Sequence, residues 1–219
     1  MSTAIRLEQI PSAEMRLAED NAALLRAMGI ATVHLFGPPG SGKTTLIRRT
    51  IESLAGRLRP AVIQSILSAR NEPNSLQDLD ISVIHVHTGG RPRLDASMLR
   101  GALEELPLAD IDLVLIEEVG SLTSSTEHPP GNSLGIVIVS LPEGEDCPLR
   151  YPEPFSLADG VVLNKLDLQP ALDFDRARFH QAVRGLNRKA PIWELSCRTG
   201  EGLAAWENWL LGQVERLRG

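Results

Sequence analysis

The stretch that decides the fold is Gly37-Pro38-Pro39-Gly40-Ser41-Gly42-Lys43-Thr44, which matches GxxxxGK[ST] at every fixed position. An apolar run at residues 31–36 precedes it, and residues 44–54 have helical character. This setting is typical of a phosphate-binding loop, because glycines let backbone N–H groups surround a β-phosphate. We predict that Lys43 contacts the β- and γ-phosphates, that Thr44 ligates Mg²⁺ and that Thr45 also lines the nucleotide site. The alternative is a glycine-rich turn that binds nothing.

The rest of the chain alternates short apolar runs with helix-like or loop segments. The apolar runs cover residues 31–36, 60–67, 81–87, 111–116, 135–141, 160–163 and 192–195. Such a pattern is typical of a parallel sheet covered by helices on both faces. We therefore predict one α/β P-loop NTPase domain over residues 1–219, with a mostly parallel sheet of about seven strands. Residues 1–30 are expected to be a helical segment packed on this domain, and the polar stretches 68–78 and 121–133 to be functional loops.

Composition narrows the class of protein. The 219 residues are 42% hydrophobic and 23% charged, which is the profile of an ordinary soluble globular protein. A net charge of -6 without a basic run argues against a nucleic-acid partner. No apolar run approaches the ~20 residues that cross a bilayer, and no signal peptide is recognisable, so we expect no membrane association and a cytoplasmic location. Two cysteines, Cys147 and Cys197, are too few for a disulfide framework and are expected to be reduced.

A second motif lies at residues 111–117, where the apolar run Ile-Asp-Leu-Val-Leu-Ile is followed by Glu117. P-loop proteins place at such a strand end the carboxylate that orients water on Mg²⁺. We assign that role to Glu117 and expect the backbone amide of Gly120 to sense a γ-phosphate. With Lys43, these residues form the predicted catalytic set. The neighbouring Glu118 is expected to be solvated at the strand end.

The base that is bound is indicated by residues 161–167, Val-Val-Leu-Asn-Lys-Leu-Asp, an apolar strand that runs into Asn-Lys-x-Asp. The Asp167 carboxylate can accept hydrogen bonds from guanine N1–H and its 2-amino group, whereas adenine offers no such pair. This predicts GTP and GDP as ligands. The Lys165 stem can cover the purine ring, and Asn164 can tie this loop to the P-loop. Backbone amides of Ser196-Cys197-Arg198 are expected to bind guanine O6.

Taken together, these motifs resemble the HypB family of hydrogenase nickel-incorporation GTPases, relatives of the urease accessory GTPase UreG. The resemblance spans nearly the whole chain and is most specific at residues 142–152, Pro-Glu-Gly-Glu-Asp-Cys-Pro-Leu-Arg-Tyr-Pro. It also includes an ExxG strand end in place of DxxG, and the Ser-Cys-Arg-Thr-Gly turn. The resemblance implies a GTP-dependent homodimer that helps deliver nickel to the hydrogenase large subunit with a small HypA-like zinc protein.

Departures from the family pattern concern its metal ligands. Members of the family usually carry Cys-His in a TGxxCHLDA segment, and here residues 88–96 place Pro92 and Arg93 in those positions. A further family cysteine aligns with Ser124, and the Cys- or His-rich amino-terminal metal stores are absent. Proline has no ligating side chain and arginine repels a cation. The interprotomer nickel or zinc site is therefore predicted to be lost.

Hydrolysis is expected to be slow. The family has a Gly-Asp pair after the second strand, but residues 62–68 read Val-Ile-Gln-Ser-Ile-Leu-Ser, without an acid. One alternative is a GTP-gated scaffold that does not hydrolyse GTP; another is a small-molecule kinase, against which Asn-Lys-x-Asp argues. His85 and His87 share a strand face and could reach a metal, but we expect packed or hydrogen-bonded strand residues.

Overall fold

Parallel strands form the centre of the molecule in the computed structural model, which describes residues 13–66, 76–91, 94–118, 122 and 133–218. Every strand pairing found there is parallel, and the order across the sheet is β3-β2-β4-β1-β5-β6-β7. The strands are β1 (Ala31–Phe36), β2 (Pro60–Ile66), β3 (Ser82–His87), β4 (Leu113–Glu117), β5 (Ser133–Ser140), β6 (Gly160–Asn164) and β7 (Ile192–Glu194).

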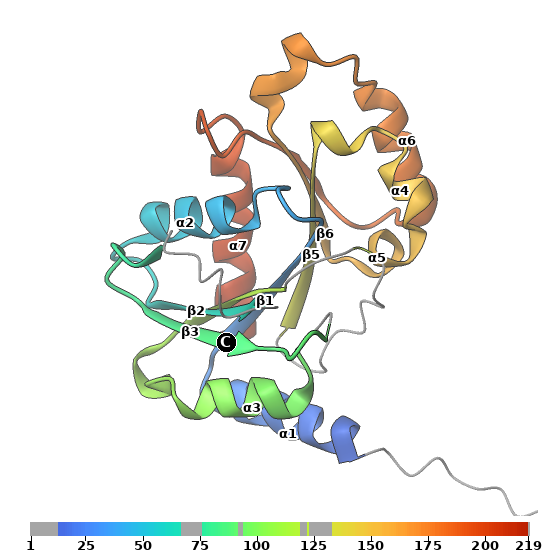
Figure 1. Ribbon diagram of the computed structural model, residues 1–219. Coiled ribbons are helices and arrows are strands. Elements are labelled where there is room, and N and C mark those ends of the chain that lie inside the picture. The colour runs from blue at the N-terminus through green and yellow to red at the C-terminus, as the bar shows by residue number, and fades with distance from the viewer. Residues whose placement is uncertain (1–12, 67–75, 92–93, 119–121, 123–132, 219) are drawn as a thin grey trace, which may run out of the picture.

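Helices cover both faces of this sheet (Figure 1). They are α1 (Ala13–Ala27), α2 (Lys43–Leu54), α3 (Ala96–Glu104), α4 (Cys147–Arg150), α5 (Pro152–Leu157), α6 (Arg176–Leu186) and α7 (Leu203–Arg218), with short 3-10 turns η2 (Leu108–Asp110), η3 (Leu141–Glu143) and η4 (Leu166–Ala171). The prediction of a parallel α/β sheet covered on both faces is confirmed.

Alternate residues of the strands feed cores on opposite faces of the sheet, as strand geometry requires. Val62 of β2 and Leu115 of β4 belong to the cluster with α2 and α7. Their neighbours Ile63 and Val114 belong to the cluster that α1 and α3 cover. A third cluster packs β5 and β6 against α5 and α6, around the buried ring of Phe179. Burial on both faces explains why these strands read as continuous apolar runs.

The strand predicted to begin at residue 111 begins at Leu113. Asp112 lies just before it and accepts hydrogen bonds from the backbone N–H and the side chain of Arg59, with Arg218 nearby at 3.0 Å. The hydrogen bonds from the Arg59 side chain lower the pKa of the Asp112 carboxyl. These contacts attach the amino ends of β2 and β4 to the last helix.

The first helix begins at Ala13 within the described residues, and it packs against α3. The Asn21 side-chain amide donates to the Ala96 carbonyl at 2.8 Å, and Leu25 is buried in the cluster beneath both helices. No helix among the described residues is long and apolar enough to span a membrane.

Candidate nucleotide-binding site

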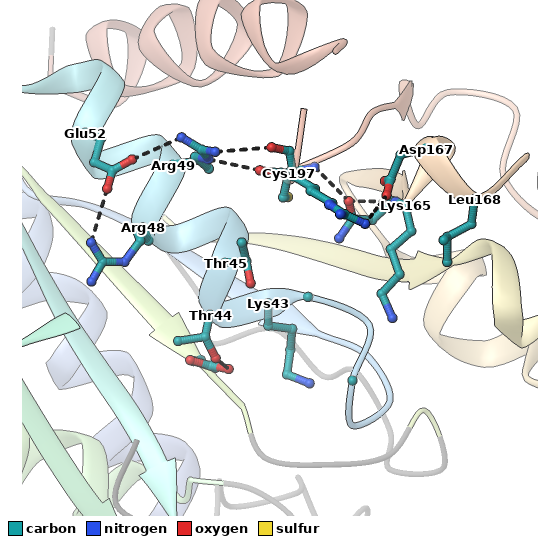
Figure 2. A pocket seen from close by; sticks show the side chains of 15 residues that line it. Lys43, Thr44, Thr45, Arg48, Arg49, Glu52, Lys165, Asp167, Leu168 and Cys197 are labelled. Atoms are coloured by element: carbon teal, nitrogen blue, oxygen red, sulfur yellow. Dashed lines mark hydrogen bonds and ion pairs between the residues drawn. The ribbon is translucent and has the colours of Figure 1, made fainter. Parts of the chain in front are cut away.

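A cavity of about 830 Å³ opens where β1, β4 and β6 end (Figure 2). In open parallel sheets, ligands bind at the carboxyl ends of the strands. The cavity is lined by Gly40, Gly42, Lys43, Thr44, Thr45, Arg48, Arg49, Glu52, Glu117, Asn164, Lys165, Asp167, Leu168, Cys197 and Arg198. It therefore brings together most of the residues predicted for phosphate, magnesium and base. The predicted residues Gly37, Pro38, Pro39, Ser41 and Ser196 are described by the structure but are not among those that line the cavity.

The loop between β1 and α2 needs glycine at two positions. Gly42 has a φ of 102°, and a Cβ there would lie 2.2 Å from the side-chain nitrogen of Asn164. A Cβ on Gly37 would lie 2.1 Å from the Ile138 carbonyl oxygen. Pro39 and Gly40 form the exposed tip of the loop, and Ser41 is fully buried. The glycines thus allow the loop to close against β5 and β6.

Lys43 is the first residue of α2, and its side chain turns back along the loop. Its ammonium donates to the carbonyls of Gly37 at 2.7 Å and Pro38 at 3.1 Å. Burial lowers the pKa of this lysine, while the negative charges of Glu117 and Glu143 oppose that shift. The structure thus places a cation within the loop, beside the positive end of the helix dipole. Both favour bound phosphate.

Thr44 and Glu117 form the candidate magnesium end of the cavity. The Thr44 hydroxyl donates to Glu117 Oε1 at 2.6 Å, so two oxygen side chains from α2 and β4 meet. A hydroxyl and a carboxylate are hard oxygen donors of the kind that Mg²⁺ accepts, directly or through water. The donor set at this point therefore fits a magnesium ion. Thr45, the next residue, is exposed at the cavity edge.

Two polar residues that were not predicted to belong to the site lie behind Glu117. The side-chain amide of Gln64 donates to Glu117 Oε2 at 2.7 Å. His85 Nε2 lies 3.1 Å from Gln64 Oε1. His85 is thus a hydrogen-bonded strand residue, as predicted. The sequence signal that could have indicated Gln64 is the pair of polar residues, Gln64 and Ser65, that interrupts the apolar residues of β2.

Glu118 is not solvated at the strand end, so that expectation was wrong. It is 5% exposed, and one carboxylate oxygen lies 3.6 Å from His34 Nδ1. The Leu94 backbone N–H donates to the other oxygen at 3.3 Å. Glu118 is buried because β4 is a central strand, and β1 and the segment before α3 enclose its end. The carboxylate connects that segment to β4.

The opposite side of the cavity holds the candidate base site. Asn164, at the end of β6, donates to the Ser41 carbonyl at 2.9 Å and accepts from the Cys197 backbone N–H at 3.1 Å. Lys165 follows in a left-handed conformation with a φ of 64°. The Ser196 hydroxyl donates to Asp167 Oδ1 at 2.6 Å. These contacts join the P-loop, the Asn-Lys-x-Asp segment and the Ser-Cys-Arg turn.

Arg49 of α2 strengthens the same connection. Its guanidinium donates to the Cys197 carbonyl at 2.9 Å and to the Arg198 carbonyl at 3.3 Å (Figure 2). The Arg198 side chain is 83% exposed and lies 3.8 Å from Asp167 Oδ2.

Cys147 and Cys197 are both buried, and burial raises the pKa of each thiol to about 11. Cys197 therefore contributes backbone rather than a thiolate.

Several predicted residues lie outside the described part of the chain. They are Gly120 of the predicted catalytic set and the departures Pro92, Arg93 and Ser124. Most of the two predicted loops, 68–78 and 121–133, is also outside it. Among the described residues, no group of three or more His, Cys, Asp or Glu side chains could hold a metal ion.

A known protein family matches the part of the chain that carries this site. Residues 31–194, from β1 to the end of β7, match the family described as CobW/HypB/UreG, nucleotide-binding domain. This span contains the P-loop, Glu117 and Asp167.

The chain belongs to the CobW/HypB/UreG family. The hydrogenase maturation factor HypB of Azotobacter chroococcum is 38% identical over 100% of this chain and 70% of that protein. The Escherichia coli K12 hydrogenase maturation factor HypB is 37% identical over 89% of this chain and 67% of its own length. The resemblance to a HypB-like GTPase is therefore confirmed.

Solved HypB structures share the fold. HypB from Archaeoglobus fulgidus superposes with a TM-score of 0.83 at 33% identity, over 92% of this chain and 98% of that one. HypB from Helicobacter pylori, solved in complex with nickel, gives a TM-score of 0.86 at 27% identity over 94% and 96%. Together with the family match, they identify the chain as a HypB-like member of the CobW/HypB/UreG family.

Proposed function

We propose that this chain is a magnesium-dependent GTPase that acts as an accessory protein in the maturation of nickel-containing hydrogenases. The observation that carries the proposal is the joined nucleotide site: Asn164 bonds to the P-loop, while Ser196 holds Asp167 at the other end of the same cavity. A GTP molecule would have its phosphates at Lys43 and its base at Asp167. The similarity to hydrogenase maturation factors supports the biological setting.

The chemistry would be attack of water on the γ-phosphate, catalysed by positioning and charge neutralisation. Lys43 and the loop amides would stabilise negative charge on the phosphate oxygens. Thr44 and Glu117 would hold Mg²⁺, which when bound neutralises phosphate charge. Gly120 remains a proposed contact of the γ-phosphate.

We expect this hydrolysis to be slow, because residues 62–68 contain no acid and Gln64, a neutral residue, is the β2 residue paired with Glu117. Under single-turnover conditions with Mg²⁺ we expect bound GTP to be converted to GDP and phosphate at a low rate, with ATP left intact. Phosphate release can be followed with a purified chain in excess over labelled GTP. Tight GTP binding without any conversion would instead support the non-hydrolysing scaffold. Phosphate transfer to a small acceptor would support a kinase.

The interactions of this chain are proposed from the same resemblance. We propose that it forms a GTP-dependent homodimer and that it contacts a HypA-like zinc protein and the hydrogenase large subunit in the cytoplasm. A hydrogenase-producing strain that lacks this chain should lose nickel from its hydrogenase large subunit. Restoration by the wild-type gene would support the maturation role.

We further propose that this chain lacks the family's interprotomer nickel or zinc site. Pro92, Arg93 and Ser124 offer no thiolate or imidazole, which are the ligands those metals prefer. Equilibrium titration with Ni²⁺ and Zn²⁺, with and without GTP, should show no stoichiometric submicromolar site while GTP binding persists. Such a site, abolished by replacing His85 and His87, would contradict this and make those histidines ligands.

A further inference from the structure

Polar side chains form a row across three neighbouring strands behind the magnesium end of the cavity. In the strand register, Gln64 of β2 is paired with Glu117 of β4 on one side and with His85 of β3 on the other. The three positions share the sheet face that α2 covers, since Val62, Leu115 and Val83 at the same parity pack in that core. The row begins at the edge strand and ends at the cavity.

The hydrogen bonds along this row have a fixed direction. Glu117 accepts at both oxygens, from Thr44 at 2.6 Å and from Gln64 at 2.7 Å. A carboxylate oxygen accepts hydrogen bonds, whereas an amide nitrogen only donates them. Gln64 therefore turns its nitrogen to Glu117 and its oxygen to His85. The contact of 3.1 Å between Gln64 Oε1 and His85 Nε2 then requires the imidazole to carry its proton on Nε2.

The consequence concerns how the magnesium residues are oriented. Because the Thr44 hydroxyl hydrogen points at Glu117, its lone pairs remain available for a cation. Gln64 is 2% exposed, so without His85 its carbonyl oxygen would be buried and unpaired. The neutral amide also holds Glu117 without placing a second negative charge beside it. His85 therefore restrains Gln64, which in turn restrains Glu117.

We propose that His85 and Gln64 are positioning residues for the magnesium site of the proposed GTPase. They set the rotamer of Glu117 and, through it, the direction of the Thr44 hydroxyl, without touching nucleotide. This rests on the proposed function, since it specifies how that site recruits Mg²⁺. Replacing His85 should weaken magnesium-dependent binding and leave magnesium-free nucleotide binding intact.

The test compares His85→Leu, Gln64→Leu and His85→Gln, whose amide can still donate, with the exposed His87→Leu as a control on the same strand. Fluorescent GTP binding is measured across a Mg²⁺ titration, and GDP binding in EDTA. Loss of outer partners of metal ligands weakens metal affinity by about tenfold or more, so both leucine variants at the row should need about tenfold more Mg²⁺. His85→Gln and His87→Leu should stay within about twofold of wild type.

Two results would overturn the proposal. One is an unchanged Mg²⁺ requirement in His85→Leu; the other is an equal loss of GDP affinity in EDTA, which would indicate a purely structural role. Nitrogen-15 spectra of the nucleotide-free protein add a readout that needs no GTP: His85 should be the Nε2–H tautomer, and this preference should relax in Gln64→Leu. An Nδ1–H tautomer would refute the chain of bonds. If the wild-type protein bound no guanine nucleotide, the proposed function would fail. The spectra would still test whether His85 and Gln64 are hydrogen-bonded in the direction described.

Discussion

Lys43→Ala is expected to lower GTP affinity by about 100-fold, equivalent to roughly 3 kcal/mol, because it removes a charge-assisted contact to the phosphates. The side chain is buried within the loop, yet it bonds to the Gly37 and Pro38 carbonyls rather than packing in an apolar core. The fold should therefore persist. Isothermal titration with GTP and GDP measures the loss, and circular dichroism checks the fold.

Lys189→Ala is the matched control, since Lys189 is exposed after α6 and lies outside the residues that line the cavity. That variant should bind GTP like wild type. Unchanged GTP affinity in Lys43→Ala would show that the loop at residues 37–44 does not bind the phosphates. Equal losses in both variants would point to a general effect of charge.

The sheet could be predicted because its strands are buried on both faces, which makes them apolar over their whole length. The P-loop at residues 37–44 then placed β1 and α2 with little ambiguity. Strand ends were less predictable: Asp112 belongs to the apolar run in sequence, but its carboxylate pairs with Arg59 before the strand begins. The family resemblance followed from several motifs at once and was confirmed.

The residues behind the candidate magnesium site could not be predicted, because their proximity depends on strand order. Gln64 meets Glu117 only because β2 and β4, which are not consecutive in the chain, are neighbours in the sheet. The same reason explains the wrong expectation for Glu118, whose environment is made by His34 of β1 and the backbone before α3. Two adjacent acids at a strand end, here Glu117 and Glu118, are expected to be solvated when the sequence does not show which segments cover that end.

In the proposed function, one carboxylate determines the preference for guanine, so Asp167→Asn should shift the preference from GTP to xanthosine triphosphate. Guanine presents two donors, N1–H and the 2-amino group, to the acceptor pair of Asp167. Asparagine keeps one acceptor and replaces the other by a donor, which suits the 2-oxo group of xanthine. Because Ser196 donates to Oδ1 at 2.6 Å, the asparagine oxygen should keep that position and its nitrogen should face the base.

We expect Asp167→Asn to bind GTP about 100-fold more weakly, because two hydrogen bonds to an ionised acceptor are lost or opposed, and to bind xanthosine triphosphate more tightly than wild type. Competition between the two nucleotides for one fluorescent GDP analogue measures both changes. Asp173→Asn, an exposed change shortly after η4, should keep the GTP preference. If Asp167→Asn kept it as well, the Asn-Lys-x-Asp assignment would be wrong. A loss of both nucleotides would indicate that Asp167 mainly orders the turn through Ser196, so only a reversal of preference establishes direct reading of the base.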